Sequence, residues 1–362
     1  MFKFILVVSL FGLISSCASK NDFTEPSKVD LVKVFEIDKS KLENFETKPV
    51  SAKVDKKEKS SVVKSKNSTT KLPIKKETSS KKNKESDVIE KVDLEETTPE
   101  VVKPENHPDY PPEFIKYNTQ FKKYWVEQKP FFKVGEKFKL SVSWSIFKAG
   151  DIELETLGEL EIGGRKVIGF KAKMESAEYF ESIYKLKDSI ESYVTYDNFL
   201  PVKFSMQQRE SGQSVDDLQL FDSEKLKTYF YYHRLKKGKK KEINKEEFTP
   251  RFFTDSFSAL HFIRGMNLNV GDEFVVPVVT RAKVWLLKAK VSHYENIEIM
   301  GKKVKAILIK AETQFPGVLK KSGDILFWYS ADPSHKILKF EAKIKIGTVK
   351  GELIDYQEGR VD

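Results

Sequence analysis

Cysteine is nearly absent from this sequence, because Cys17 is the only one among 362 residues. A single thiol excludes an intramolecular disulfide, even for a protein in an oxidising compartment. The apolar run near the N-terminus is also short. Residues 4–14 provide only about 11 positions, whereas a membrane-spanning helix needs roughly 20. This run is therefore too short to be a membrane span.

Recognisable catalytic patterns are missing as well. The five histidines are scattered without the spacing of a zinc site, and no Gly-x-Ser-x-Gly, P-loop or dinucleotide-binding glycine pattern occurs. Two acidic pairs, Asp188 with Glu191 and Asp216 with Asp217, are explained more simply as charged turns than as a general acid and base. We therefore expect no enzyme activity and no metal site.

The N-terminus has the order of residues found in a secretory signal peptide. Lys3 precedes the apolar residues 4–14, and two serines come before Cys17. The stretch 13–17, Leu-Ile-Ser-Ser-Cys, resembles the bacterial lipobox. That resemblance implies removal of residues 1–16 and attachment of acyl chains to Cys17, and two or more such chains hold a protein stably on a membrane. An uncleaved leader with an ordinary cysteine is the alternative.

Ala18 and Ser19 follow the cysteine. In lipoproteins of diderm bacteria, an aspartate after the cysteine commonly signals retention in the inner membrane. Its replacement here implies an outer-membrane lipoprotein that faces the periplasm, although the inner membrane and the cell surface stay open. The covalent lipid is the only cofactor expected.

Residues 17–109 contain few aromatics and many Lys, Glu, Ser and Thr side chains. Such a composition buries too little apolar surface to offset the entropy lost on ordering. We therefore predict a disordered tether of about 90 residues with a typical end-to-end distance of about 50–60 Å. A lysine excess over residues 53–84 suits either a solvated spacer or contact with anionic lipid head groups or wall polymer.

Residues 110–130 are predicted to form an amphipathic helix. Aromatic residues recur there at spacings of three and four after two prolines. They are Phe114, Tyr117, Phe121, Tyr124 and Trp125. We expect this aromatic stripe to pack on the following domain, and a membrane-surface role is the alternative.

Residues 131–362 have the pattern of a mainly β domain. Apolar residues alternate with polar ones in the first predicted strand, which places one set on a buried face. That set is Phe138, Leu140, Val142, Trp144 and Ile146. Gly163 and Gly164 predict a hairpin turn further along. The expected fold is an antiparallel curved sheet or an open β-barrel.

Two stretches of this domain repeat each other at an offset of about 136 positions. Residues 134–136, Val-Gly-Glu, recur as residues 270–272, Val-Gly-Asp, and the turn at 162–167 recurs at 299–304. Two related β units are therefore predicted, although such turns are also common in unrelated meanders. The predicted units are residues 131–250 and 266–357, with a short helix at about 255–265 between them.

A series of structural motifs carries a family resemblance. They are the Val-Gly-Glu opening at 134–136, Trp144, Ala149-Gly150, residues 188–192, Leu200-Pro201, residues 255–264, Gly323 to Trp328 and Asp332. Over about residues 131–356 the chain resembles the bacterial envelope family catalogued as domain of unknown function 3108. The resemblance implies a periplasmic β-rich domain and supplies no catalytic residues. Ile337-Leu338-Lys339 departs from the proline-containing segment expected there.

One cluster of lysines stands out in a chain whose net charge is +10. It consists of Lys236, Lys237, Lys239, Lys240 and Lys241 around Gly238. The glycine, which follows the aromatic stretch 229–234, predicts a basic hairpin tip. This tip is a candidate site for anionic lipid or wall polymer, with a solvated turn as the alternative. Export makes nucleic acid an unsuitable partner.

Two functions fit these features. A non-catalytic binding or scaffold module in envelope assembly or maintenance would have a filled core, and it would bind an anionic polymer, a lipid or another envelope protein. An acyl-chain carrier or sensor would instead have an apolar cavity above about 300 Å³. The candidate lining residues of such a pocket are Val142, Trp144, Val276 and Trp328. We expect the binding module, and the carrier is the alternative.

Overall fold

The computed structural model describes residues 31, 35, 37–38, 41, 43–49, 103–129, 131–314, 324–344 and 347–360. They belong to one folded unit, whose chain continues on both sides of residues 51–102. Cys17, the predicted signal peptide and most of the predicted tether lie outside the described residues. In the described part, no helix is long and apolar enough to cross a membrane.

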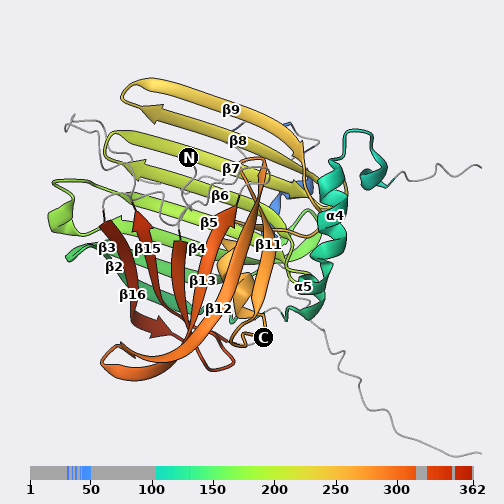
Figure 1. Cartoon of the computed structure of the whole chain (residues 1–362). Coiled ribbons are helices and arrows are strands. Elements are labelled where there is room, and N and C mark those ends of the chain that lie inside the picture. The colour runs from blue at the N-terminus through green and yellow to red at the C-terminus, as the bar shows by residue number, and fades with distance from the viewer. Residues whose placement is uncertain are drawn as a thin grey trace, which may run out of the picture. The chain divides into compact units, whose positions relative to one another are not determined.

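One large sheet forms most of the unit (Figure 1). The first-half strands are β1 (Thr47–Pro49), β2 (Lys137–Trp144), β3 (Phe147–Ile162), β4 (Arg165–Ser176), β5 (Lys187–Thr195), β6 (Pro201–Glu210), β7 (Gln213–Asp222), β8 (Lys227–Lys236) and β9 (Lys239–Phe248). The later strands are β10 (Thr254–Asp255), β11 (Glu273–Thr280), β12 (Lys283–Ile299), β13 (Lys302–Gln314), β14 (Asp324–Ser330), β15 (Ile337–Ile344) and β16 (Gly347–Gln357). The helices are η2 (Glu43–Phe45), η3 (Pro104–Asn106), α4 (Pro112–Gln120), α5 (Lys122–Glu127), η4 (Glu178–Phe180) and α6 (Ser258–Arg264).

The strand order keeps each predicted unit together. The sheet runs from β10 through β11 to β16, then to β2 and on to β9, with β1 paired to β3 outside this path. The antiparallel β16–β2 pair joins the end of the second unit to the start of the first, and only the two-residue β10 pairs in parallel among the pairings of described strands. The path has two ends, β9 and β10, so the sheet stays open. The mainly β, open and curved sheet predicted from the sequence is confirmed.

Helix α6 is packed in the main apolar core of the sheet. All seven of its residues are buried, and its Phe262 and Ile263 belong to the main apolar core. The predicted helix at 255–265 is therefore confirmed with a later start, because Thr254 and Asp255 extend as β10. Asp255 accepts hydrogen bonds from the N–H groups of Phe257 and Ser258, at 2.8 and 2.9 Å, and so caps the helix.

The aromatic helix predicted at 110–130 forms as two helices, α4 and α5, which Figure 1 shows beside the sheet. Phe121 lies between them at φ −99° and ψ −8°, where its N–H still bonds to the carbonyl of Tyr117. Phe114, Phe121 and Tyr124 are buried in the main core. The predicted packing of the aromatic stripe on the β domain is therefore confirmed.

We define the described residues from Leu31 to Pro49 as the N-terminal strap. The strap covers the face of the sheet that points away from α6. Strand β1 pairs with the end of β3, and the buried Phe45 packs edge-on against Tyr229. Consecutive residues Val167 and Ile168 belong to different apolar clusters, so this part of the sheet buries both faces. The predicted disordered tether is therefore wrong for residues 43–49, because Leu31, Ile37 and Phe45 supply the apolar contacts that its average composition hides.

Candidate functional site

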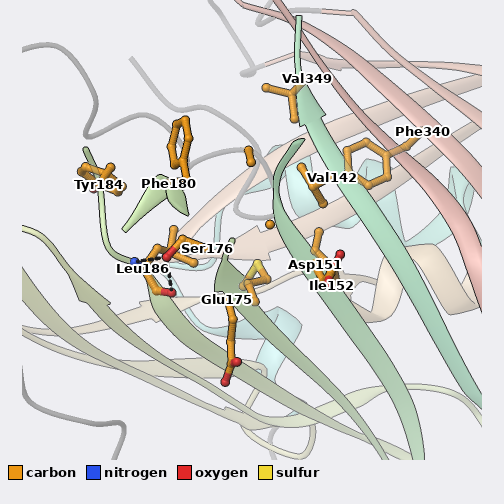
Figure 2. A pocket seen from close by; sticks show the side chains of 13 residues that line it. Val142, Asp151, Ile152, Glu175, Ser176, Phe180, Tyr184, Leu186, Phe340 and Val349 are labelled. Carbon is orange, nitrogen blue, oxygen red and sulfur yellow. Dashed lines mark hydrogen bonds between the residues drawn. The ribbon is translucent and has the colours of Figure 1, made fainter. Parts of the chain in front are cut away.

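An apolar cleft lies at one end of the strands, where β2, β3 and β4 meet β15 and β16. Figure 2 shows its lining, with Phe180 and Tyr184 apart from Val142, Phe340 and Val349. The remaining lining residues are Ala149, Gly150, Asp151, Ile152, Met174, Glu175, Ser176 and Leu186. The cleft is lined mainly by apolar side chains and is our candidate binding site.

The loop between β4 and β5 closes over this cleft. Ala177 donates its N–H to the carbonyl of Ala149 at 2.9 Å, and Leu186 donates its N–H to Ser176 Oγ at 3.0 Å. Phe180 and Tyr184 of this loop are both buried and line the cleft on the side away from Phe340 and Val349 (Figure 2). The loop is thus hydrogen-bonded to β3 and to the end of β4 on either side of its aromatic residues.

Glycine at position 150 permits the close approach of two strands beneath the cleft. A Cβ atom at Gly150 would lie 2.0 Å from the carbonyl oxygen of Glu175, a distance no side chain tolerates. The register pairs Gly150 with Ser176, next to the start of the covering loop. The sequence motif Ala149-Gly150 is therefore explained by strand packing and not by chemistry.

The size of the cleft limits what it can bind. Its internal volume is about 30 Å³, which is about one water molecule's share of liquid volume and far below the roughly 300 Å³ of small ligand pockets. A larger hollow of about 290 Å³ lies over the charged residues of β2, β3 and β4. Ion pairs cross it, with Lys137 Nζ 3.2 Å from Glu155 Oε1, so it does not suit an acyl chain.

Beside the cleft, a buried polar network ties the covering loop to β6. Tyr184 Oη donates to Glu210 Oε2 at 2.6 Å, and Gln208 Nε2 donates to Glu210 Oε1 at 3.2 Å and to Asp188 Oδ2 at 3.4 Å. Burial, reinforced by the charge of Asp188, raises the pKa of Glu210 to about 8. Burial therefore favours the protonated form of Glu210. It does not line the cleft, so it holds the loop and has no access to a ligand there.

A second buried network fixes α6. Arg264 donates from both terminal nitrogens to Glu136, at 2.7 and 2.9 Å, and neither side chain is exposed. Tyr356 Oη donates to the same carboxylate at 3.0 Å, and the carbonyl of Ser334 accepts from Arg264. Every strong charge here has a partner, which is the condition for burying an ion pair.

His261 of α6 is the one histidine of the described residues that is buried. Its ring stacks on Phe170 with centroids 3.9 Å apart, and neither ring nitrogen has a hydrogen-bond partner. Burial, with the charge of Arg264, lowers the pKa of His261 well below its usual value, so the ring is neutral. The stacking on Phe170 explains why a histidine is buried here. Neither ring nitrogen has a partner with which it could exchange a proton. Among the described residues, no group of His, Cys, Asp and Glu side chains is arranged to hold a metal.

The acidic pairs noted in the sequence are dispersed into separate contacts. Asp216 pairs with Arg209 at 2.7 Å and Asp217 with Arg281 at 2.6 Å, whereas Glu191 pairs with Lys171 at 2.5 Å. These carboxylates lie in ion pairs of the sheet and do not face one another across a cleft.

The four candidate pocket residues have different surroundings. Val142 lines the apolar cleft, whereas Val276 and Trp328 are buried in the main core. Trp328 Nε1 donates to Glu295 Oε1 at 2.6 Å, and the half-buried Trp144 lies at the edge of the core. The structure therefore brings only Val142 to the cleft.

The basic cluster forms the predicted hairpin tip. Strand β8 ends at Lys236 and β9 begins at Lys239, and between them Lys237 and Gly238 have φ values of 49° and 72°, as this tight turn requires. All five lysines are exposed. Lys240 Nζ lies 2.7 Å from Glu242 Oε1. Binding of anions by this tip stays a prediction.

One feature of the site was not predicted. Ile146, assigned above to a buried strand face, lies in the β2–β3 turn and is 88% exposed. The strand ends at Trp144, and Ser145 has a positive φ of 56°, so the alternation stops two residues early. Phe147 and, in the covering loop, Tyr179 and Ile183 are also exposed. Their apolar character gave no signal because apolar residues are expected inside.

Two solved structures that resemble this chain share little sequence with it. A β-barrel-like protein of domain of unknown function DUF1849 from Brucella abortus is 10% identical, with 63% of this chain and 99% of that chain covered and a TM-score of 0.41. A candidate lipoprotein from Parabacteroides distasonis is 10% identical, with 64% and 100% covered and a TM-score of 0.29. Such values transfer no property of those proteins to this chain.

Sequence comparison gives a firmer relationship. No curated protein matches the chain. The model of the family described as "Protein of unknown function (DUF3108)" matches residues 139–354, which is more than half of the 362 residues. The matched region contains the strands from within β2 to within β16 and the cleft between them. The chain therefore belongs to the DUF3108 family.

Proposed function

We propose that this protein is a non-catalytic binding module of the bacterial envelope, lipid-anchored through Cys17 to the outer membrane and facing the periplasm. One observation carries the proposal: the inside of the sheet is occupied by α6 and by core side chains, and the apolar cleft leaves a volume of only about 30 Å³. A filled interior directs binding to the outer surface of the protein.

The buried Arg264–Glu136 pair supports the same conclusion. It joins α6 to the residue just before β2, and both charges are fully buried. Removing the helix to admit a ligand would leave Glu136 without its counter-charge Arg264, which costs several kcal/mol. This cost supports a fixed core over a cavity with a removable plug.

Native mass spectrometry of the lipidated full chain, purified from the envelope, tests this proposal. The expected mass is that of the processed chain with its covalent acyl groups and no additional lipid. A stoichiometric extra acyl lipid would favour the carrier. Val142→Trp should then fill the cleft and abolish that lipid, whereas the matched surface change Val126→Trp should leave it bound.

The anchor has a separate test. Cys17→Ala should abolish labelling by a fatty-acid probe in cells, because the acyl groups have no other thiol to occupy. Ser16→Ala preserves a small residue before the cysteine and is the matched control. Persistent labelling of the Cys17→Ala chain would refute lipidation at this position and leave the binding role to be judged by the first experiment.

The carrier remains the alternative because the cleft, though small, is apolar and closed by one loop. An acyl chain could enter only if Phe180 and Tyr184 moved away, and the hydrogen bond from Tyr184 to Glu210 opposes that movement.

A further inference from the structure

Exposed large apolar side chains lie close in sequence to residues of β3 and of the β4–β5 loop that line the cleft. The described residues include eleven such side chains, and four of them lie on two neighbouring segments, the β2–β3 turn with the first residue of β3 and the β4–β5 loop. We call these four the apolar rim: Ile146, Phe147, Tyr179 and Ile183, exposed by 88, 57, 59 and 71%. Scattered single apolar residues are normal on a surface, but a group on neighbouring loops marks an interaction site.

The two loops of the rim are in direct contact. Tyr179 Oη donates to the carbonyl of Lys148, next to Phe147, and Ala177 donates its N–H to the carbonyl of Ala149. Strands β3 and β4 also pair up to Gly150 and Ser176, immediately below. The four side chains therefore project from one connected patch of backbone.

The basic hairpin tip lies at the same end of the strands. Ser211, in the β6–β7 turn, donates its N–H to the carbonyl of Lys185 in the covering loop at 2.8 Å. Lys237 in the basic tip donates its N–H to the carbonyl of Gly212 at 3.3 Å. This chain of contacts runs from the apolar rim through the β6–β7 turn to the lysines.

The charge at this end is positive. Next to the rim, Lys148 pairs with Asp151 at the start of β3 and Lys185 pairs with Glu181 in the β4–β5 loop, so these charges largely cancel, and Glu178 adds one negative charge. The tip then supplies five lysines, which are Lys236, Lys237, Lys239, Lys240 and Lys241. Glu242 offsets one of them. Apolar side chains flanked by such a charge excess are complementary to an anionic lipid surface.

We propose that this end of the sheet is a membrane-contact surface, with the apolar rim inserted at the head-group level of an anionic bilayer and the basic tip resting on its phosphates. Isoleucine and phenylalanine leave water on insertion, and tyrosine places a polar hydroxyl near the interface. The lysines add attraction that salt screens. The inference goes beyond the proposed function because it assigns the protein a second, non-covalent membrane contact.

Vesicle co-sedimentation of the chain from Ala18 onward, which lacks both the apolar residues 4–14 and Cys17, tests this contact without the covalent lipid. Vesicles of phosphatidylethanolamine and phosphatidylglycerol should bind the chain, whereas vesicles of phosphatidylcholine should bind it at least about tenfold more weakly. Replacement of the rim by Ile146→Ser, Phe147→Ser and Ile183→Ser should reduce binding by at least about tenfold. Because these three side chains are exposed, folding should be unaffected.

A matched control removes apolar side chains elsewhere. Val126→Ser, Val270→Ser and Met300→Ser replace residues exposed by 73, 51 and 51% on other elements, and this variant should bind like the parent. Equal binding by the rim variant and the control would overturn the proposal. A parent chain that binds neither vesicle would also overturn it and leave the rim to a protein partner. Neither result would affect the mass measurement that tests the proposed function.

Discussion

Glu136 and Asp272 occupy corresponding positions at the starts of the two β units. In the first unit, Gly135 donates its N–H to the carbonyl of Thr156 at 2.8 Å, and Thr156 donates back to the carbonyl of Glu136 at 2.9 Å. In the second, Gly271 and Asp272 exchange the same two bonds with Val291, both at 2.9 Å. The recurring Val-Gly-acid motif therefore builds the same backbone arrangement twice.

The two acidic side chains have different surroundings. Glu136 is fully buried and binds both terminal nitrogens of Arg264. Asp272 is half-buried and accepts the N–H of Asn269 in its own turn, at 3.0 Å. The comparison shows that a repeated motif determines local backbone pairing, whereas the neighbouring element, here α6, determines how much stability the side chain contributes.

The largest expected effect on the free energy of unfolding comes from removing the negative charge of each carboxylate in turn. Glu136→Gln should lower the free energy of unfolding by about 3–5 kcal/mol, because Arg264 stays charged and buried without a counter-charge. Asp272→Asn should lower it by less than about 1 kcal/mol, because the new amide oxygen can still accept the turn hydrogen bond. Urea unfolding of both variants measures the difference, and equal losses would contradict it.

A double variant sharpens this test. Glu136→Met combined with Arg264→Met removes both charges and keeps apolar volume, so it should recover most of the stability lost by Glu136→Gln. Failure to recover would mean that packing around Tyr356 and Ser334, and not the unpaired charge, dominates the loss.

A smaller effect should distinguish the two units by how their stability depends on pH. Since the folded-state pKa of Glu210 is about 8, above its usual 4.5, the folded state retains a proton that the unfolded state loses. Its stabilising contribution is present below about pH 4.5 and is lost as the pH rises through about 8. A pKa unit corresponds to about 1.4 kcal/mol, so the whole shift would correspond to about 5 kcal/mol. Because Asp188 shares the titration, we assign less than half of this to Glu210 and expect a loss on the order of 2 kcal/mol.

Hydrogen exchange locates that loss. Amides of β5 and β6, which carry Asp188 and Glu210, should lose more protection than those of β12 and β13 as the pH rises, after correction for intrinsic exchange. Glu210→Gln cannot ionise and should remove the difference between the units. A Glu210→Gln chain that retains the pH dependence would assign it to another group.

The smallest effects should be alike in the two units. Gly135 and Gly271 have φ values of +79° and +95°, and a Cβ atom at either would meet no atom within 4 Å. Gly135→Ala and Gly271→Ala should therefore each cost about 1 kcal/mol from backbone strain alone. Thermal and urea unfolding would measure this, and a several-fold larger loss at one glycine would show that the two positions are not equivalent.

Features with a local cause were predictable from the sequence. The alternation of Phe138, Leu140 and Val142 predicted the buried face of β2, and Gly238 among lysines predicted the β8–β9 turn. The motif at 134–136 predicted where a unit begins. In each case a few consecutive residues determine the conformation.

Features that depend on distant partners were not predictable. Nothing near Glu136 in the sequence announces Arg264, 128 positions away, and the burial of Phe45 depends on Tyr229 of β8. The narrow cleft likewise depends on Phe180 and Tyr184 folding back over β3. The composition of residues 17–109 is polar on average. It could not show that Leu31, Ile37 and Phe45 pack on a face of the sheet.

The N-terminal strap changes the distance that a lipid anchor allows. Leu31 is buried on the sheet, and Cys17 precedes it by 31 − 17 = 14 positions. At about 3.3–3.6 Å per residue, 14 residues reach roughly 50 Å at full extension. Residues 51–102 do not add to this reach, because the chain on both sides of them belongs to the same folded unit. A chain anchored at Cys17 would therefore hold Leu31, and the face of the sheet on which it is buried, within roughly 50 Å of the attachment point.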